Sequence, residues 1–423
     1  MKKFLVLVGV LVLGMVLIAG MVEAVSLYVP GSYTTIQAAV NAANNGDTIY
    51  VSAGTYNEAV YINKGIALVG VGTPTITAQG LGYTHTVTFN GVQMNNALIS
   101  GFIITMAQNV YRGIYCNQGS PTITNNIISW NGIGIECNNS SPIIINNTIE
   151  GSLFYGILCD DYSSPIIANN IIEGNSEDGI HCRDFSSPII TNNTITKNKK
   201  CGVYCLNGCS PIITNNIIIE NGLISSDYYG IYDNPFYWNA PIIDYNCVWR
   251  NGFNYNNNYG GCFHQGHDIS ANPQFIGVGD YYLGTNSPCI DAGSNTAPGI
   301  PNKDKDGKPR IINSIVDMGA YEYQDTSIFA SDNNNVKVYP NPYKKGDPKF
   351  GGDYIYFGNV SQGAVIKIYN IAGELIKEID EIDVVNCRQK WNISQENIAS
   401  GVYIYTVTGG GDGKSVGKIG IIK

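Results

Sequence analysis

The sequence predicts an all-β fold, a parallel β-solenoid followed by a small β-sandwich. Two observations predict the solenoid. One similar unit recurs at intervals of 21 to 30 residues, and each unit consists of apolar runs of three to five residues separated by Asn and Gly. Such runs are too short for helices and suit strands. The sandwich is predicted by alternating segments such as VIKIYNI and GVYIYTV after residue 335.

Each unit aligns on a proline, which is followed two residues later by Ile and five residues later by Asn. The prolines are Pro121, Pro142, Pro165, Pro188, Pro211 and Pro241. Asn tolerates the left-handed backbone of a sharp corner, so we expect each unit to form one coil of the solenoid. Strands of successive coils should pair at about 4.8 Å, with Ile stacked on Ile inside and Asn on Asn at the corner.

Five of the 11 cysteines recur at one position of successive coils, two residues after an inward-facing aliphatic residue. They are Cys116, Cys137, Cys159, Cys182 and Cys205. We expect this cysteine ladder to consist of buried free thiols that behave as small apolar groups. Disulfides and metal ligation are the alternatives. Cys262 and Cys289 could pair, and the spacing of Cys201, Cys205 and Cys209 is a weak zinc pattern.

The segment TIQAAVNAANNGDTIYVSAGTYNEAVYINKGIALVG, residues 35–70, resembles the N-terminal cap and first coil of secreted right-handed parallel β-helix proteins of the pectate-lyase-like family. This resemblance extends over about residues 26–323. We expect Thr34 and Gln37 to form a capping box at the start of a short helix that closes the solenoid. The segments NPQFIGVGDYYLGTNSPCIDAG and NKDKDGKPRIINSIVDMGAYEYQ resemble the closing segment of bacterial secreted β-helix proteins.

Four parts follow along the chain. Residues 1–24 have the lysines, apolar run and small-residue cleavage site of a signal peptide. Residues 25–324 form the predicted β-helix, and residues 325–335 a polar linker. In residues 336–423, the motifs YPNP, IYNIAGELIK, ASGVYIYTV and KIGIIK resemble the C-terminal sorting domain of the type IX secretion route and its Ig-like relatives. That resemblance implies contact with secretion or anchoring machinery and a location at the outer cell surface.

Composition narrows the possible partners. The net charge is −9, and no run of Lys and Arg interrupts it, so we expect no nucleic-acid partner. No segment after the signal peptide is apolar and long enough to cross a bilayer, so an uncleaved signal segment is the alternative way to anchor the chain. We expect a monomer.

Departures from the repeat mark the candidate catalytic positions. Asp161 and Asp184 align at one outward position of adjacent coils, with Asp160 and Arg183 immediately before them. Carboxyl groups about 5 Å apart suit a retaining glycosidase. An arginine beside carboxylates is the grouping that lyase chemistry would need. The alternative is ordinary variation of a polar surface.

Candidate ligand-binding residues surround the same coils. Aromatic and imidazole side chains there could stack on sugar rings or assist proton transfer: Tyr162, Phe185, His181, Tyr228, Tyr229 and Trp238. Asn302, Asp304 and Asp306 follow the order of a calcium loop, although position 12 of that loop would be Asn313 instead of Glu. We therefore expect a charged surface turn there, with calcium as the alternative and no other cofactor.

The motifs typical of polygalacturonase-like enzymes, pectin methylesterases and alginate epimerases are absent from the sequence. The sequence therefore favours a secreted surface protein that binds extracellular polysaccharide without turnover. A polysaccharide lyase or glycoside hydrolase that uses the acidic cluster is the second hypothesis. A purely structural surface or adhesion protein is the third.

Overall fold

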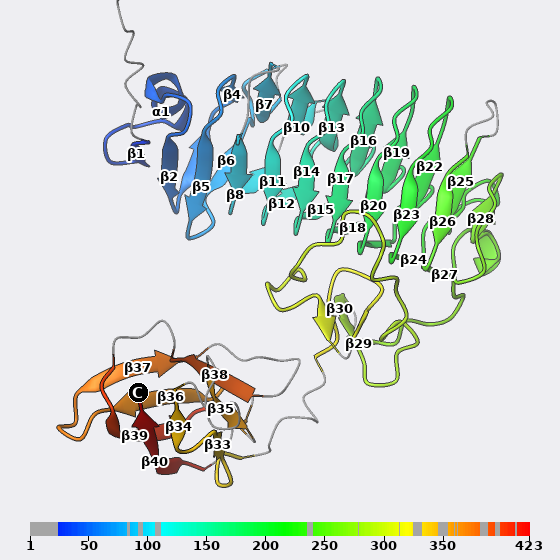
Figure 1. Cartoon of the computed structure of the whole chain (residues 1–423). Helices are drawn as coiled ribbons and strands as arrows, with labels where there is room; N and C mark the ends of the chain where they lie inside the picture. The colour runs from blue at the N-terminus through cyan, green and yellow to red at the C-terminus, as the bar shows by residue number, and fades with distance from the viewer. Residues whose placement is uncertain are drawn as a thin grey trace, which may run out of the picture.

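The computed structural model of the 423-residue chain describes most of the sequence beyond the expected signal peptide. The described residues are 24–82, 85–91, 96–105, 111–234, 240–277, 279–312, 314–324, 332–345, 354–358, 360–361, 363–380, 388–393, 398–410 and 413–423. Two parts are seen, a β-solenoid and a C-terminal β-domain (Figure 1).

Three parallel sheets run along the solenoid, and each coil contributes one short strand to each sheet. The first sheet contains β1 (Ser26–Val29), β2 (Thr48–Ser52), β5 (Ala67–Val71), β8 (Leu98–Ser100), β11 (Thr122–Thr124), β14 (Ile143–Ile145), β17 (Ile166–Ala168), β20 (Ile189–Thr191), β23 (Ile212–Thr214) and β26 (Ile242–Asp244).

The second sheet contains β3 (Thr55–Asn57), β6 (Thr75–Thr77), β9 (Ile103–Thr105), β12 (Ile127–Ser129), β15 (Thr148–Glu150), β18 (Ile171–Glu173), β21 (Thr194–Thr196), β24 (Ile217–Ile219) and β27 (Cys247–Trp249). The third sheet contains β4 (Val60–Ile62), β7 (Val87–Asn90), β10 (Arg112–Asn117), β13 (Ile133–Asn138), β16 (Ile157–Asp160), β19 (Ile180–Cys182), β22 (Val203–Cys205), β25 (Ile231–Asp233) and β28 (Tyr259–Gly260).

The interior consists of stacked side chains, as the repeat predicts. The aligned isoleucines and the five residues of the cysteine ladder are fully buried. All ten described cysteines are free thiols, so the suggested Cys262–Cys289 disulfide is not formed. Instead, Cys289 lies beside Cys247, whose thiol raises the pKa of Cys289.

Two ladders of buried asparagines close the corners of the coils. In the predicted ladder, each Asn backbone N–H and side-chain amide donates to the Oδ1 of the Asn one coil later, as Asn147 does to Asn170 at 2.8 and 3.1 Å. A second ladder, which the sequence analysis did not find, has the same bonds and contains Asn175, Asn198, Asn221 and Asn251. The buried amides are therefore satisfied by hydrogen bonds from coil to coil.

The short helix α1 (Ile36–Ala42) covers the N-terminal end of the solenoid, and Ile36, Ala39 and Val40 are its buried residues. The expected capping box is one residue out of place, because Thr35 is the N-cap and its hydroxyl accepts from the Ala38 N–H at 3.1 Å. Glu58 from the next coil accepts the first two helical N–H groups. Tertiary contact therefore supplies the carboxylate that the local sequence lacks.

The closing segment lies along the side of the solenoid instead of across its end (Figure 1). After the 3-10 turn η1 (Phe253–Tyr255), it forms two hairpins, β29 (Phe275–Gly277) with β30 (Asp280–Leu283) and β31 (Ile311–Ile312) with β32 (Ile315–Val316). Corner asparagines donate to its carbonyls: Asn169 to Lys303, Asn192 to Asp317, and Asn215 to Ser294.

The C-terminal domain has the predicted sandwich form. A three-stranded sheet contains β33 (Lys337–Tyr339), β35 (Tyr354–Gly358) and β38 (Arg388–Asn392), and a five-stranded sheet contains β34 (Tyr343–Lys344), β36 (Val365–Tyr369), β37 (Leu375–Ile379), β39 (Gly401–Thr408) and β40 (Ser415–Ile422). Side chains of both sheets share one core, in which Trp391 is fully buried.

Candidate functional site

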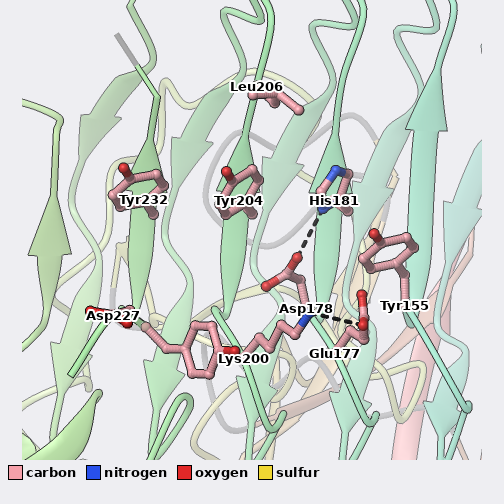
Figure 2. Close-up of a pocket in the computed structure, with 10 residues that line it drawn as sticks. Tyr155, Glu177, Asp178, His181, Lys200, Tyr204, Leu206, Asp227 and Tyr232 are labelled. Atoms are coloured by element: carbon pink, nitrogen blue, oxygen red, sulfur yellow. Dashed lines mark hydrogen bonds and ion pairs between the residues drawn. The ribbon is translucent and has the colours of Figure 1, made fainter. Parts of the chain in front are cut away.

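A row of aromatic side chains crosses the outer face of the third sheet. The strand register pairs Leu158 with His181, His181 with Tyr204, and Tyr204 with Tyr232. These residues immediately precede the inward-facing positions of the cysteine ladder, so their side chains point outward because successive residues of a strand alternate between its faces. Each coil thereby places one side chain at the same point of the outer face (Figure 2).

Three rings of this row are stacked, and the fourth, of Tyr155, is tilted by 33° against His181. The His181 and Tyr204 ring centroids are 4.9 Å apart with an interplanar angle of 9°, and those of Tyr204 and Tyr232 are 5.2 Å apart at 24°. Tyr155 extends the row on the other side of His181, at 4.3 Å. We call Tyr155, His181, Tyr204 and Tyr232 the aromatic row.

Charged side chains of the preceding turns fix one edge of the row. The Asp178 carboxylate lies 2.8 Å from His181 Nδ1 and accepts from the Cys201 backbone N–H at 2.7 Å. Lys200 donates to Glu177 at 2.8 Å, and Figure 2 shows this ion pair and the contact between Asp178 and His181. Burial lowers the pKa of Lys200, but the bond to Glu177 and its charge outweigh burial and raise it. The imidazole and the ammonium group are thus held in place by carboxylates.

These groups line an open cleft of about 330 Å³. Its walls consist of the aromatic row together with Glu177, Asp178, Lys200, Leu206, Asp227 and Tyr228. Three carboxylates face one ammonium group, which gives a net charge of −2 with His181 neutral. Burial and the neighbouring Glu177 raise the pKa of Tyr155 to about 12, so its hydroxyl stays protonated at neutral pH and can donate.

The predicted acidic cluster has a different geometry from the one the repeat suggested. Asp160, and not Asp161, pairs with Asn138 in the third sheet, because one extra residue precedes the corner of this coil. Arg183 holds the buried Asp160 carboxylate with two hydrogen bonds, of 2.9 and 2.6 Å. Although burial raises the pKa of Asp160, the bonds and charge of Arg183 outweigh that effect and lower it.

Asp161 and Asp184 occupy left-handed corners, with φ of 50° and 52°. Asp184 accepts from the Asn207 side chain at 2.8 Å and lies 3.8 Å from the Arg183 guanidinium. The cluster is therefore an ion-paired edge of the sheet, and neither corner aspartate lines the cleft. Its catalytic role stays a prediction.

Comparison with known proteins gives a family match for each of the two parts of the chain. Two overlapping segments, residues 65–218 and 112–275, match the family model for the right handed beta helix region. The solenoid belongs to this family. Residues 337–423 match the model of a secretion system C-terminal sorting domain. The chain is a secreted cell-surface β-helix protein that carries a sorting tail.

Individual relatives are distant from this β-helix protein. A cell surface glycoprotein of Methanothermus fervidus is 36% identical over 132 residues, 30% of this chain, and the match spans only 21% of that glycoprotein. Pectate lyase Pel9A is 15% identical, with a TM-score of 0.48 over 72% of this chain and 98% of the lyase. The type-IX secretion component PorZ of Porphyromonas gingivalis is 25% identical, with a TM-score of 0.18 over 21% of this chain and 12% of PorZ.

The predicted ligand residues of the β-helix protein separate into two places. His181 and Tyr228 line the cleft, and Tyr229 stacks on Tyr232 at 5.1 Å. Tyr162 and Phe185 stack on each other at 5.4 Å on the outer corner, where they are 65% and 40% exposed. Trp238 lies outside the described residues.

Sequence reasoning missed Tyr155 and Tyr204. Tyr204 had a readable signal, because it directly precedes a cysteine of the ladder, as His181 does, and must therefore face outward beside it. Tyr155 had none, since it stands in a loop and reaches the row only through the turn before β16.

The suggested calcium loop is organised by its own backbone. Asp304 is buried, and its Oδ1 accepts from the N–H groups of Asp306 and Lys308 at 3.0 and 2.9 Å, while its Oδ2 accepts from Glu322 at 3.1 Å. Asn302 and Asp306 are exposed, and the Tyr282 hydroxyl donates to Asp306. Across the described ranges, no group of three or more His, Cys, Asp or Glu could hold a metal ion. Calcium binding here stays a prediction that this geometry does not favour.

The part of the chain that the structure describes includes no helix both long and apolar enough for a membrane span. The expected signal peptide falls on residues 1–23, outside the described ranges, and on Ala24.

Proposed function

We propose that this cell-surface β-helix protein binds a neutral extracellular polysaccharide in the cleft of the third sheet. The observation that carries the proposal is the aromatic row, which presents one ring per coil at the regular spacing of a parallel sheet, about 4.8 Å. A polymer of similar units can meet such a row with the same contact several times. Aromatic side chains with polar edges suit sugars, which have apolar ring faces and many hydroxyl groups.

The charge of the cleft supports a neutral ligand. With a net charge of −2 in the cleft and −9 on the whole chain, a polyanion would meet repulsion at every subsite. The carboxylates of Glu177, Asp178 and Asp227 can instead accept hydrogen bonds from sugar hydroxyls. The tyrosine hydroxyls can donate.

Affinity electrophoresis of the mature protein against neutral and acidic polysaccharides tests the proposal. We expect retardation by at least one neutral polymer, weakened tenfold or more in Tyr204→Ala. Tyr61→Ala is the matched control, because Tyr61 faces outward from the same sheet at β4, away from the cleft, and is 44% exposed. Equal loss in both variants, or retardation by acidic polymers alone, would contradict the proposal.

Turnover of the bound polymer is a second candidate function, favoured by the contact between Asp178 and His181 Nδ1. A carboxylate that fixes an imidazole is a common arrangement for general acid or base catalysis. New reducing ends or unsaturated products would reveal turnover. If it occurs, we expect His181→Gln to abolish it and the double variant Asp161→Asn, Asp184→Asn to retain it. Turnover that is retained in His181→Gln and lost in the double variant would instead assign catalysis to the acidic cluster.

A further inference from the structure

A second cleft lies between the outer face of the second sheet and the hairpin β29–β30, which folds back beside it (Figure 1). Its volume is about 430 Å³, within the range of small-molecule sites. It is lined by Trp249 of β27, by the corner residues Lys197, Glu220 and Arg250 that directly follow β21, β24 and β27, and by Phe275 and Tyr281 of the hairpin.

The hairpin wall is held in place by specific contacts. The Tyr281 hydroxyl donates to Glu173 on β18, and Lys197 Nζ lies 3.4 Å from the same hydroxyl. Phe275 packs edge-on against the Tyr281 ring, with centroids 5.3 Å apart. Because Tyr281 is buried between hairpin and sheet, the cleft is formed before any ligand arrives.

Three charged residues of the cleft occupy one corner position of successive coils. Lys197, Glu220 and Arg250 have φ of 56°, 54° and 53°, and the backbone N–H groups of Lys197 and Glu220 donate to Ile219 and Trp249 of the next coil. Left-handed corners usually carry Asn or Gly, so long charged side chains here depart from the rule of the repeat. They give this cleft a net charge of +1, opposite in sign to the first cleft and to the whole chain.

The two cations keep their donors available. The Arg250 guanidinium lies 5.0 Å from the Trp249 ring and 4.2 Å from the Tyr255 ring. Within the described residues, it has these ring contacts but no carboxylate partner and no side-chain hydrogen bond. In the part of the chain that the structure describes, the Lys197 ammonium group has Tyr281 as its one polar or ring partner. A guanidinium that is oriented by rings and has free donors matches the two-oxygen geometry of a carboxylate or a sulfate ester.

We propose that this second cleft binds an anionic sugar unit. The sugar ring packs against Trp249, and its carboxylate or sulfate group binds Arg250, with Lys197 adding a second positive charge. Glu220 lies between the two cations and accepts from the sugar hydroxyls, which distinguishes a sugar acid from a simple anion. This site uses a different sheet and the opposite charge from the neutral-polymer cleft, so it stands independently of the proposed function.

Isothermal titration of the mature protein with three probes tests the inference: a glucuronate disaccharide, its methyl diester, and glucose 6-sulfate. We expect the disaccharide, the sulfate or both to bind at least tenfold more tightly than the neutral diester. The preferred anion identifies the anionic group. Affinity for it should fall at least tenfold in Arg250→Gln and partly recover in Arg250→Lys. Binding should weaken at high salt, because the attraction is ionic and partly exposed.

Lys199→Gln is the matched control, since it removes one positive charge from an exposed side chain that contacts Ser176 and does not line the cleft. Its affinity should equal that of the wild type, and Tyr204→Ala should also leave the affinity unchanged. Equal affinity for the acid and its diester, no binding of any probe by folded protein, or full affinity in Arg250→Gln would each overturn the proposal.

Discussion

Asp233 occupies the inward position that Cys205 holds one coil earlier, because the two residues pair directly in the third sheet. The Asp233 side chain is buried, with 6% of its surface exposed, and burial raises the pKa of its carboxyl group to about 6. The cysteine ladder therefore continues into a coil where the thiol is replaced by an acid that resists ionisation.

Replacing this acid by its neutral isostere should stabilise the protein above pH 6. The pKa is about 6 when folded and near 3.8 when unfolded, so ionisation costs stability as the pH rises from 3.8 through 6. At pH 7.5, Asp233→Asn should raise the free energy of unfolding by on the order of 2 kcal/mol. At pH 3 the wild type and Asp233→Asn should have the same free energy of unfolding. Urea denaturation at both values checks this, and an unchanged pH dependence in the variant would refute it.

Replacing an asparagine of the buried ladder should lower the free energy of unfolding far more than replacing an asparagine on the surface. Asn170 accepts from the backbone and side chain of Asn147, donates to two backbone carbonyls, and donates to Asn193. Asn170→Ala leaves several of these buried groups without partners, and each costs about 1–3 kcal/mol. We expect the free energy of unfolding, measured by chemical denaturation, to fall by roughly 3 kcal/mol or more.

Asn256→Ala provides the comparison for this ladder. Asn256 is exposed, and its side chain makes no hydrogen bond within the described residues. Asn256→Ala should change the free energy of unfolding by no more than about 0.5 kcal/mol. Similar losses in both variants would mean that the ladder bonds do not stabilise the solenoid.

The five cysteines of the ladder should resist alkylation in the native protein. All are fully buried, and for Cys182 the neighbouring thiol of Cys159 and burial both raise the pKa. The reactive thiolate is therefore scarce and inaccessible. Iodoacetamide treatment followed by peptide mass spectrometry should modify these positions only after denaturation. Cys262, which is partly exposed, should react earlier than they do. Early modification of Cys159 or Cys182 would show that they are not interior.

The solenoid could be predicted from the sequence because its rule is local and repeated. Ile167 and Asn170 recur with the same spacing in coil after coil, so one alignment places the stacked isoleucines, the first asparagine ladder and the cysteines. The prediction failed where one residue is inserted. There Asp160, and not Asp161, pairs with Asn138 and forms an ion pair with Arg183, while Asp161 and Asp184 keep equivalent corner positions on adjacent coils.

The two clefts could not be predicted from the sequence, because they are formed by contacts that the repeat does not encode. Tyr155 joins the aromatic row from a loop, and Tyr281 reaches Glu173 from more than 100 residues away. Likewise, the closing segment follows the side of the solenoid because corner asparagines such as Asn192 and Asn215 donate to it. Their spacing alone marks them as corners and does not reveal what they bind.

Arg310 should control how firmly the closing segment is attached. Its guanidinium is 1% exposed and donates to the carbonyls of Gly319 and Ala320, beside the Glu322 carboxylate. Arg310→Met would leave buried acids without their cation, which typically costs 3–5 kcal/mol. Limited proteolysis should then cut within residues 287–324. Lys308→Met is the control, because Lys308 forms a partly exposed 3.6 Å ion pair with Asp306 and should change little.

The damage from Arg310→Met should remain local. In a solenoid each coil is stabilised mainly by its two neighbours, and the closing segment lies beside the coils without forming part of their sheets. The cysteine ladder should therefore stay protected from alkylation in this variant while the closing segment is cleaved. Because the hairpin β29–β30 forms one wall of the second cleft, the same variant should also bind the anionic probe less tightly. Exposure of Cys182 together with cleavage would show instead that solenoid and closing segment unfold as one unit.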